Sequence, residues 1–290
     1  MALLGPVSSS SRYAMSEVAE MHKTPMLYGI DYEGRHFNEY LICYSTIPEQ
    51  YINPLIPYAV DNLGDQFYIF GYDYIWPHRM SKRIIEQVEE NDATISGVEF
   101  APFGVLDYTQ VLDRIEQSQA NVLMLILPGR DGFRFLHQIH QYQFSRPIEV
   151  IAFAADETYL ANVQHEALDG IYTALNFFSD LETQVERDFA TQFRQMHGND
   201  SIVTYSTKSH YDLIYLLKQA IEASESNDKQ SIMNNLENLT LYQGKSMITL
   251  RADHHVALPM HLGQFQGDAL KVVHSFGIIE PDDQRWVTNE

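Results

Sequence analysis

The sequence predicts an α/β fold built on a parallel β-sheet, and three observations carry this prediction. First, apolar strand-forming runs alternate along the chain with amphipathic helical segments. Second, the run Val122–Leu127 is apolar at every position, which is typical of a strand covered by helices on both faces. Third, Gly71 and Pro128-Gly129 end the strand runs that they follow. The alternating segments are residues 67–70, 78–90, 94–100, 108–117 and 122–127.

The alternation continues beyond this stretch without a break in composition, as expected of further β–α units. Later in the chain the apolar spacing becomes mainly helical, and near the C-terminus it becomes that of a β-hairpin. The expected elements are a helix at 131–143, a strand at 149–153, a helix near 157–165, a strand at 170–174, long helices at 181–196 and 210–223, and hairpin strands within 244–278 around a turn at 266–268.

Aromatic residues follow the first strand of the predicted sheet. Tyr74 and Trp76 come just after the run Phe67–Phe70. Because ligands bind parallel sheets beyond the carboxyl ends of the strands, these side chains are candidate ligand contacts. Aromatic rings with hydroxyl and indole N–H groups suit a small, polar, uncharged molecule. Packing against the sheet would explain the same residues equally well.

Composition and charge narrow the class of protein. The chain has 290 residues, of which 45% are hydrophobic, enough to bury a sizeable core over two domains or lobes. A formal net charge of −20 argues against nucleic acid or an anionic membrane as partner, since both need a cationic face. No apolar run is long enough to span a membrane. Cys43 is the only cysteine, and its apolar surroundings favour a packed thiol.

The N-terminal region begins with another strand and helix. Ala2–Leu4 reads as a strand, and the serines at 8–11 precede a helix expected at about 12–22. Ser9 could offer its hydroxyl, beside free backbone N–H groups, to a carbonyl oxygen or an anion; helix capping is the alternative role. A nucleophilic serine would need the Gly-x-Ser-x-Gly elbow, which is absent. Pro25–Tyr28 is the next strand, and a polar and aromatic loop containing Asp31 follows it.

Four segments taken in order resemble one known family. They are GPVSSSSR, PMLYGIDYEG, YSTIPEQYINPLIPYAVDN and FYIFGYDYIWP, and the closing segment QGKSMITLRADHHVALPMHLGQF also matches. The chain resembles the type I periplasmic-binding-protein family over nearly its whole length. Within that family it is similar to the branch that binds urea and short-chain amides. This branch includes the solute receptors of urea ABC transporters and the amide sensor of amidase operons.

The resemblance implies a two-lobed fold of parallel sheets flanked by helices, with an incomplete first lobe. Members of the family begin with about a hundred further residues, so the chain looks truncated at its N-terminus. A signal peptide in that missing part would make the protein periplasmic; without one it would be cytoplasmic. The implied segments are 1–47 in the partial N-terminal lobe, 48–174 in the second lobe, 175–243 as a helical return to the first lobe, and 244–290 as late strands on the second lobe.

The resemblance also implies a function and a site. The lobes would close on urea or a short-chain amide, either for an ABC transporter permease or for a regulatory protein partner. Ser9 would hold the carbonyl oxygen, Tyr28 and Tyr74 would hydrogen-bond or wall the amide, and Trp76 would close the apolar side. Asp31 and Asp156 would accept hydrogen bonds from the amide N–H groups.

An enzyme is the weaker alternative, because no Ser-His-Asp, cysteine nucleophile or metal constellation is visible in the sequence. His137 and His140 have a spacing that metal ligands use, but no third ligand follows in register. No cofactor and no metal are expected.

Overall fold

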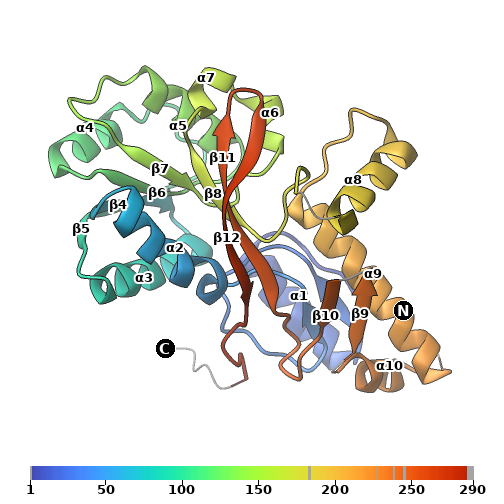
Figure 1. The fold of residues 1–290 in the computed structure, drawn as a ribbon. Helices are drawn as coiled ribbons and strands as arrows, with labels where there is room; N and C mark the ends of the chain where they lie inside the picture. Colours follow the sequence, from blue (N-terminus) through green and yellow to red (C-terminus); the bar gives the residue numbers. More distant parts are fainter. Residues whose placement is uncertain (1, 182–183, 227, 238, 244–245, 286–290) are drawn as a thin grey trace. The chain divides into compact units, whose positions relative to one another are not determined.

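The computed structural model describes residues 2–181, 184–226, 228–237, 239–243 and 246–285. The chain forms two compact units (Figure 1). The first unit comprises residues 1–50, 182–259 and 278–290, and the second comprises residues 51–181 and 260–277. No helix in the described part of the chain has the length and apolar character needed to cross a membrane.

The first unit contains a small parallel sheet. Its strands are β1 (Leu3–Leu4), β2 (Met26–Tyr28) and β3 (Leu41–Cys43), in that spatial order among the described residues. Leu3 lies opposite Met26, and Tyr28 lies opposite Cys43. The helix α1 (Ser9–Met21) connects β1 to β2. The other elements are α8 (Gln184–His197), α9 (Tyr205–Ser224), α10 (Lys229–Leu236) and the antiparallel pair β9 (Thr240–Gln243) and β10 (Ser246–Thr249).

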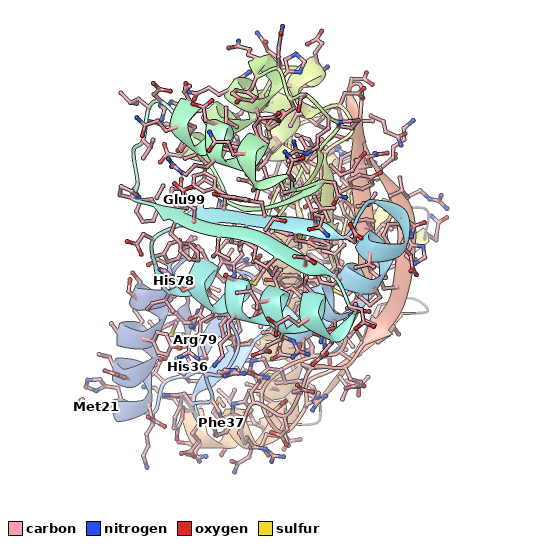
Figure 2. The ribbon with its side chains drawn as sticks, turned by 90° about the vertical axis from the view of Figure 1, so that its left-hand side faces the viewer. Met21, His36, Phe37, His78, Arg79 and Glu99 are labelled. Atoms are coloured by element: carbon pink, nitrogen blue, oxygen red, sulfur yellow. The ribbon has the colours of Figure 1, made fainter. Side chains whose placement is uncertain are left out.

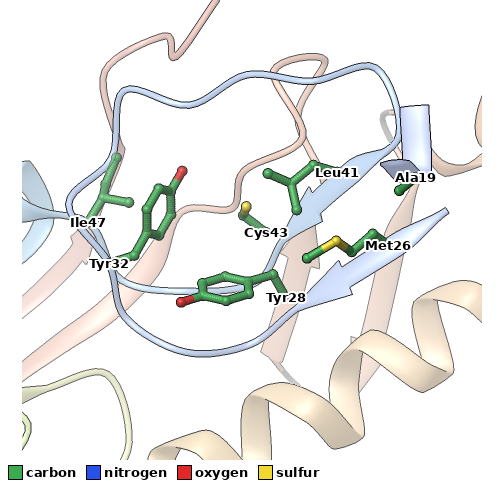
Figure 3. Packing of buried hydrophobic residues seen from close by; sticks show 7 residues of the cluster. All are labelled: Ala19, Met26, Tyr28, Tyr32, Leu41, Cys43 and Ile47. Atoms are coloured by element: carbon green, nitrogen blue, oxygen red, sulfur yellow. The ribbon is translucent and has the colours of Figure 1, made fainter. Parts of the chain in front are cut away.

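Side chains from α1, from all three strands and from the loops after β2 and β3 build the core of the first unit. Figure 3 shows the fully buried part of this cluster, in which the tyrosine rings pack beside the thiol of Cys43. Burial raises the pKa of that thiol to about 12, so the cysteine is a packing residue, as the sequence predicts. The buried members are Ala19, Met26, Tyr28, Tyr32, Leu41, Cys43 and Ile47.

The second unit is a doubly wound sheet. Its described strands follow the order β12-β11-β8-β7-β6-β4-β5, and those from β4 to β8 run parallel, while β11 is antiparallel to β8. The strands are β4 (Gln66–Tyr72), β5 (Thr94–Ala101), β6 (Val122–Ile126), β7 (Glu149–Ala152), β8 (Tyr172–Leu175), β11 (Leu258–Gln266) and β12 (Ala269–Ile279). The helices are α2 (Pro48–Asn62), α3 (Ile75–Glu90), α4 (Thr109–Ser118), α5 (Arg130–Gln141), α6 (Thr158–Asn162) and α7 (His165–Leu168).

Helices cover both faces of this sheet. Figure 2 shows His78 of α3 on one side of β5 and Glu99 on the other. His78 packs against Phe100 at 4.0 Å between ring centroids, while Glu99 pairs with Arg114 of α4. Every residue of β6 is buried, as its uninterrupted apolar sequence predicts. The predicted α/β fold with a largely parallel sheet is therefore confirmed.

The order of the strands in the sheet departs from their order in the sequence between β4 and β6. From β4 the chain moves to β5 on one side and then returns to β6 on the other side of β4. The loops after β4 and β6 therefore leave the sheet in opposite directions, which makes this position a topological switch point. Ligands of doubly wound sheets bind at such points, beyond the carboxyl ends of the strands.

The observed elements differ from the expected ones mainly at their ends. The helix expected at 78–90 begins at Ile75, and the helix near 157–165 is two short helices, α6 and α7. The start of the helix expected at 181–196 includes residues 182–183, which lie outside the described residues; α8 begins at Gln184. The turn expected at 266–268 joins β11 to β12.

The two units also divide the chain differently from the expected segments 1–47, 48–174, 175–243 and 244–290. Residues 244–259 were expected on the second lobe, but they lie in the first unit. The physical reason is that β10 pairs with β9, which already belongs to that unit. Residues 260–277 do lie in the second unit, because β11 pairs with β8.

Candidate ligand-binding site

In the first unit, α1 begins at the strand-end region that the sequence singles out. Ser8 caps the helix, because its side-chain oxygen accepts a 3.4 Å hydrogen bond from the backbone N–H of Ser11. Ser9 is buried, and its hydroxyl donates a 2.8 Å hydrogen bond to Oε2 of Glu33. The hydroxyl expected to hold a ligand's carbonyl oxygen thus has a partner inside the protein.

A fully buried ion pair lies beside Ser9. Nη2 of Arg12 is 2.6 Å from Oε1 of Glu33, and neither side chain is exposed to solvent beyond about 1%. The guanidinium also lies over the rings of Tyr13, Tyr28 and Tyr32, at 4.8, 5.4 and 4.2 Å from their centroids. Burying two charges costs solvation free energy, which the ion pair and the cation–π contacts offset.

Two neutral histidines complete this buried polar cluster. Nε of Arg12 donates a 3.3 Å hydrogen bond to Nδ1 of His36. Burial, and then the charge of Arg12, lower the pKa of His36 to about 4, so its ring is neutral at pH 7 and can accept that bond. The hydroxyl of Tyr32 bonds Nε2 of His255, whose pKa burial also lowers. The cluster is therefore internally satisfied.

The other two predicted residues of the first unit also have protein partners. The hydroxyl of Tyr28 donates a 3.1 Å hydrogen bond to the carbonyl oxygen of Val7. The hydroxyl of Tyr205 donates to Oδ1 of Asp31 at 2.5 Å. The sequence predicts neither of these two partners. The partner of Asp31 is hard to foresee because Tyr205 lies on a helix far along the chain.

In the second unit, side chains from the ends of β4 and β5 and from the start of α3 form a row of aromatic rings. The row runs from Phe103 to Tyr72 (4.2 Å between ring centroids), to Tyr74 (6.1 Å from Tyr72) and to Trp76 (6.5 Å from Tyr74). Trp76 is buried, and its indole N–H has no hydrogen-bond partner among the described residues. Tyr74 and Trp76 thus lie together at the switch point, as predicted from their position after the strand.

The loop after β7 contains a carboxyl group that the sequence analysis missed. Asp156, the predicted acceptor, uses its Oδ1 locally, accepting from the backbone N–H of Thr158 at 3.0 Å and from its hydroxyl. The neighbouring Glu157 is buried; its Oε1 accepts from the backbone N–H of Ser179 at 2.5 Å, but Oε2 has no partner among the described residues. Burial raises the pKa of Glu157 to about 7.

The backbone just before these two carboxylates has an uncommon conformation. Ala154 has a φ of 57°, a left-handed conformation that is uncommon for a residue with a Cβ. Strained backbone and carboxyl groups with a perturbed pKa both concentrate at functional sites. The only signal in the sequence is that two carboxylates follow a strand, and this does not say which one is buried.

Comparisons with known proteins identify the family. A model of the family described as "Periplasmic binding protein" matches residues 1–269, and the chain belongs to this family. It is a family of binding proteins and not of enzymes, as the sequence analysis expects.

Among solved structures, the chain is similar to an amino acid ABC transporter substrate-binding protein from Pseudomonas fluorescens, with 17% identity, a TM-score of 0.86, and 96% of this chain and 78% of that chain covered. It is also similar to a solute-binding protein from R. palustris in complex with benzoate (14% identity, TM-score 0.84, 97% and 79% covered). A leucine binding protein from Thermotoga maritima is a third (18% identity, TM-score 0.82, 97% and 80% covered). At such identities the likeness shows the fold alone.

One curated protein, a limonene hydroxylase from Geobacillus stearothermophilus, is 26% identical over 95 residues. The matched part is 33% of this chain and 18% of that protein's length. The match is too short to say anything about the activity of this chain.

The buried ion pair of the first unit leads to a stability prediction. We expect Glu33→Gln to lower the free energy of unfolding by about 3 kcal/mol, because it leaves the guanidinium of Arg12 buried without a counter-charge. Urea denaturation would measure this. Glu86→Gln is the matched control: Glu86 pairs with Arg83 at 3.1 Å in a partly exposed position, and its loss should cost less than about 1 kcal/mol. Equal effects of the two substitutions would contradict the role given to the buried pair.

The raised pKa of Glu157 leads to a prediction about pH. Between about pH 4.5 and pH 7 the unfolded chain ionises this carboxyl while the folded protein keeps it protonated, so stability falls as pH rises through that window. We expect the free energy of unfolding of Glu157→Gln, relative to the wild type, to increase by about 3 kcal/mol across the window and to stay constant above it. Denaturant midpoints measured at several pH values test this. A difference that does not change with pH would show that Glu157 is ionised in the folded protein.

Proposed function

We propose that this chain is the substrate-binding protein of an ABC-type transporter, acting in the periplasm, and that its ligand is a small uncharged amide such as urea or a short-chain amide. In the second unit, Tyr74, Trp76 and Glu157 would hold the ligand, with Asp156 beside them. Ser9, Tyr28 and Asp31 are the candidate contacts of the first unit. A transporter permease would be the protein partner.

Membership of the family supports a role in binding a solute. The solved neighbours support the assignment to the substrate-binding proteins of ABC transporters. Their titles describe substrate-binding proteins of ABC transporters, for amino acids in one case and for benzoate in another. A fold shared at low identity does not fix the ligand, because specificity depends on the few side chains at the strand ends. The identity of the ligand therefore depends on those side chains.

The pairing of charges in the first unit argues against a carboxylate ligand there. Arg12 is neutralised by Glu33, and the buried Lys208 is paired with Asp212. A ligand carboxylate would have to displace a buried protein carboxylate from either cation, leaving that group without a counter-charge. An uncharged ligand avoids this cost.

The observation that carries the proposal is that two side chains following strands of the second unit, Trp76 and Glu157, each have a buried polar atom without a partner among the described residues. Trp76 offers a buried N–H donor, and Glu157 offers a buried carboxyl oxygen. A buried polar group without a partner costs free energy, so a ligand that satisfies both gains affinity. An amide has a carbonyl acceptor for the N–H of Trp76 and N–H donors for the oxygen of Glu157. The aromatic rings beside Trp76 suit its flat, uncharged surface.

A substitution at Tyr74 tests the site. We expect Tyr74→Phe to weaken the binding of urea or acetamide by about two- to tenfold, because one hydrogen bond to the ligand is lost. Isothermal titration calorimetry measures the affinity. His137→Ala, a change within α5, is the control and should leave affinity unchanged. Equal affinities of wild type and Tyr74→Phe, or a preference for leucine or benzoate over amides, would refute the assignment.

The affinity should also depend on pH through Glu157. Amide N–H groups donate to the ionised carboxylate, so with a pKa of about 7 we expect affinity to rise by about tenfold between pH 6 and pH 8. Glu157→Gln should abolish this dependence, which calorimetry in matched buffers would show. An affinity that falls with rising pH would mean that the ligand accepts a hydrogen bond from protonated Glu157, and it would exclude an N–H donor at this position.

A further inference from the structure

The helix α9 of the first unit is apolar on two opposite faces (Figure 1). On its inner face Leu213, Leu216 and Ala220 are fully buried. On its outer face four large side chains are between 37% and 46% exposed, and they are Tyr211, Ile214, Tyr215 and Ile221. A helix that is apolar all round is normally covered on both sides. The outer face therefore has the composition of a contact surface.

The outer face has the spacing of a coiled-coil seam. Tyr211, Ile214, Lys218 and Ile221 follow one another at intervals of three, four and three residues, which are the a and d positions of a heptad repeat. Tyr215 lies beside this line. We call these five residues the outer seam. A single lysine at an a position is a known way to set the register of paired helices.

The aromatic end of the outer seam is held in place by the rest of the unit. The ring of Tyr211 lies 4.9 Å from that of Phe189, a buried residue of α8. It also lies 4.6 Å from the ring of Tyr215. Side chains that are already ordered lose little conformational entropy when a partner docks on them. The outer seam is thus prepared for a helix to pack against it.

The charges of α8 and α9 favour a second copy of this chain as the partner. Apart from histidine, each of the two helices carries two basic and two acidic residues, although the whole chain has a net charge of −20. Within the outer seam, Nζ of Lys218 is 2.8 Å from Oε1 of Glu222 on the same helix. The surface has no net charge to select a basic or an acidic partner. Two copies of it can meet without repulsion.

We propose that the outer seam of α9 is a self-association surface, at which two copies of this chain pair antiparallel about a two-fold axis. Such a contact is isologous, so the same residues serve both copies. This contact would form whether or not the chain binds an amide. It assigns a role to an apolar surface that the ligand site does not use.

The heptad pattern fixes the register of the pairing. In antiparallel helices an a position lies opposite a d position, so Tyr211 faces Ile221 of the second copy and Lys218 faces Ile214. Tyr215 of the second copy lies one residue from that level. The ammonium of Lys218 can then rest on its ring, a cation–π contact that replaces part of the lost hydration. The only charged member of the outer seam thus has a favourable place in the pair.

The size of the surface sets the expected strength of the dimer. At about 40% exposure, four side chains of this size present roughly 300 Å² of apolar area per copy. A standard stable interface buries about 800 Å² per partner. We therefore expect a reversible dimer with a Kd of roughly 10 to 100 µM.

Sedimentation velocity of the full chain tests the association. Between about 1 and 300 µM the wild type should shift from monomer to dimer. Ile214→Lys should weaken the dimer by at least about tenfold, because it places a like charge opposite Lys218. Ile214→Glu should weaken it less, because the new carboxylate faces the same lysine. The matched control is Val18→Lys, at a residue of α1 in the same unit that is 52% exposed, and it should change the Kd by less than about twofold.

Three outcomes of that experiment would overturn the proposal. They are a wild type that stays monomeric over the whole range, equal effects of Ile214→Lys and Val18→Lys, and an effect of Ile214→Glu larger than that of Ile214→Lys. All three positions changed are exposed, so circular dichroism should show the same helix content in each variant as in the wild type. A loss of helix content in a variant is answered by the second experiment, which uses other positions.

Disulfide trapping tests the orientation of the two helices. Cys43 is the only cysteine and is fully buried, so a cysteine introduced on the surface reports only on its own position. Under a mild oxidant, Tyr211→Cys mixed with Ile221→Cys should give a disulfide-linked dimer of the two variants. Ile221→Cys alone should give several-fold less, because its two copies would be ten residues apart along the pair, or about 15 Å. Equal yields would exclude the antiparallel pairing and overturn the proposal.

Discussion

Parallel strands joined by helical crossovers all end at the same edge of their sheet, and the rest of the second unit depends on this constraint. The chain reverses its direction of progress between β4 and β6, so the loops there part and the side chains after β4 are free to face a ligand. The hydroxyl of Tyr72 bonds the carbonyl oxygen of Pro128 at 3.2 Å and so ties the end of β4 to the loop after β6. Glu157 follows β7, which adjoins β6, so it belongs to the same edge of the sheet.

The polar cluster around Arg12 and the strand-end loops of the second unit differ in how their buried polar groups are satisfied. In that cluster Ser9, Glu33, Arg12 and His36 each have a partner, so these contacts stabilise the first unit. In the second unit the indole N–H of Trp76 and one oxygen of Glu157 are buried and have no partner in the part of the chain that the structure describes. A ligand that satisfies such groups offsets the cost of burying them. On the proposed function, we therefore expect the second unit to determine which ligand binds.

The sequence predicted the parts of the fold that local patterns determine. Val122–Ile126 is buried on both faces and reads as a strand because every position is apolar. The sequence predicted the location of Tyr74 and Trp76 beyond the end of β4, because both residues come just after a strand-forming run. Contacts between distant segments could not be read in this way: Arg12 pairs with Glu33 across a helix and a strand, and Tyr205 reaches Asp31 from another part of the chain. Likewise, no pattern in the sequence says that residues 246–249 pair with β9.

The choice between Asp156 and Glu157 shows why site residues are harder to predict than strands. Both carboxylates follow β7, in a loop in which Ala154 has a positive φ. Asp156 is then used to cap its own turn through Thr158, and Glu157 is buried with its pKa raised to about 7. Solved neighbours of this fold bind amino acids or benzoate, and a similar backbone could serve either of those ligands. On the proposed function, we expect selectivity in this chain to depend instead on two features. One is the buried carboxyl group of Glu157, and the other is that Arg12 and Lys208 of the first unit are already paired with protein carboxylates.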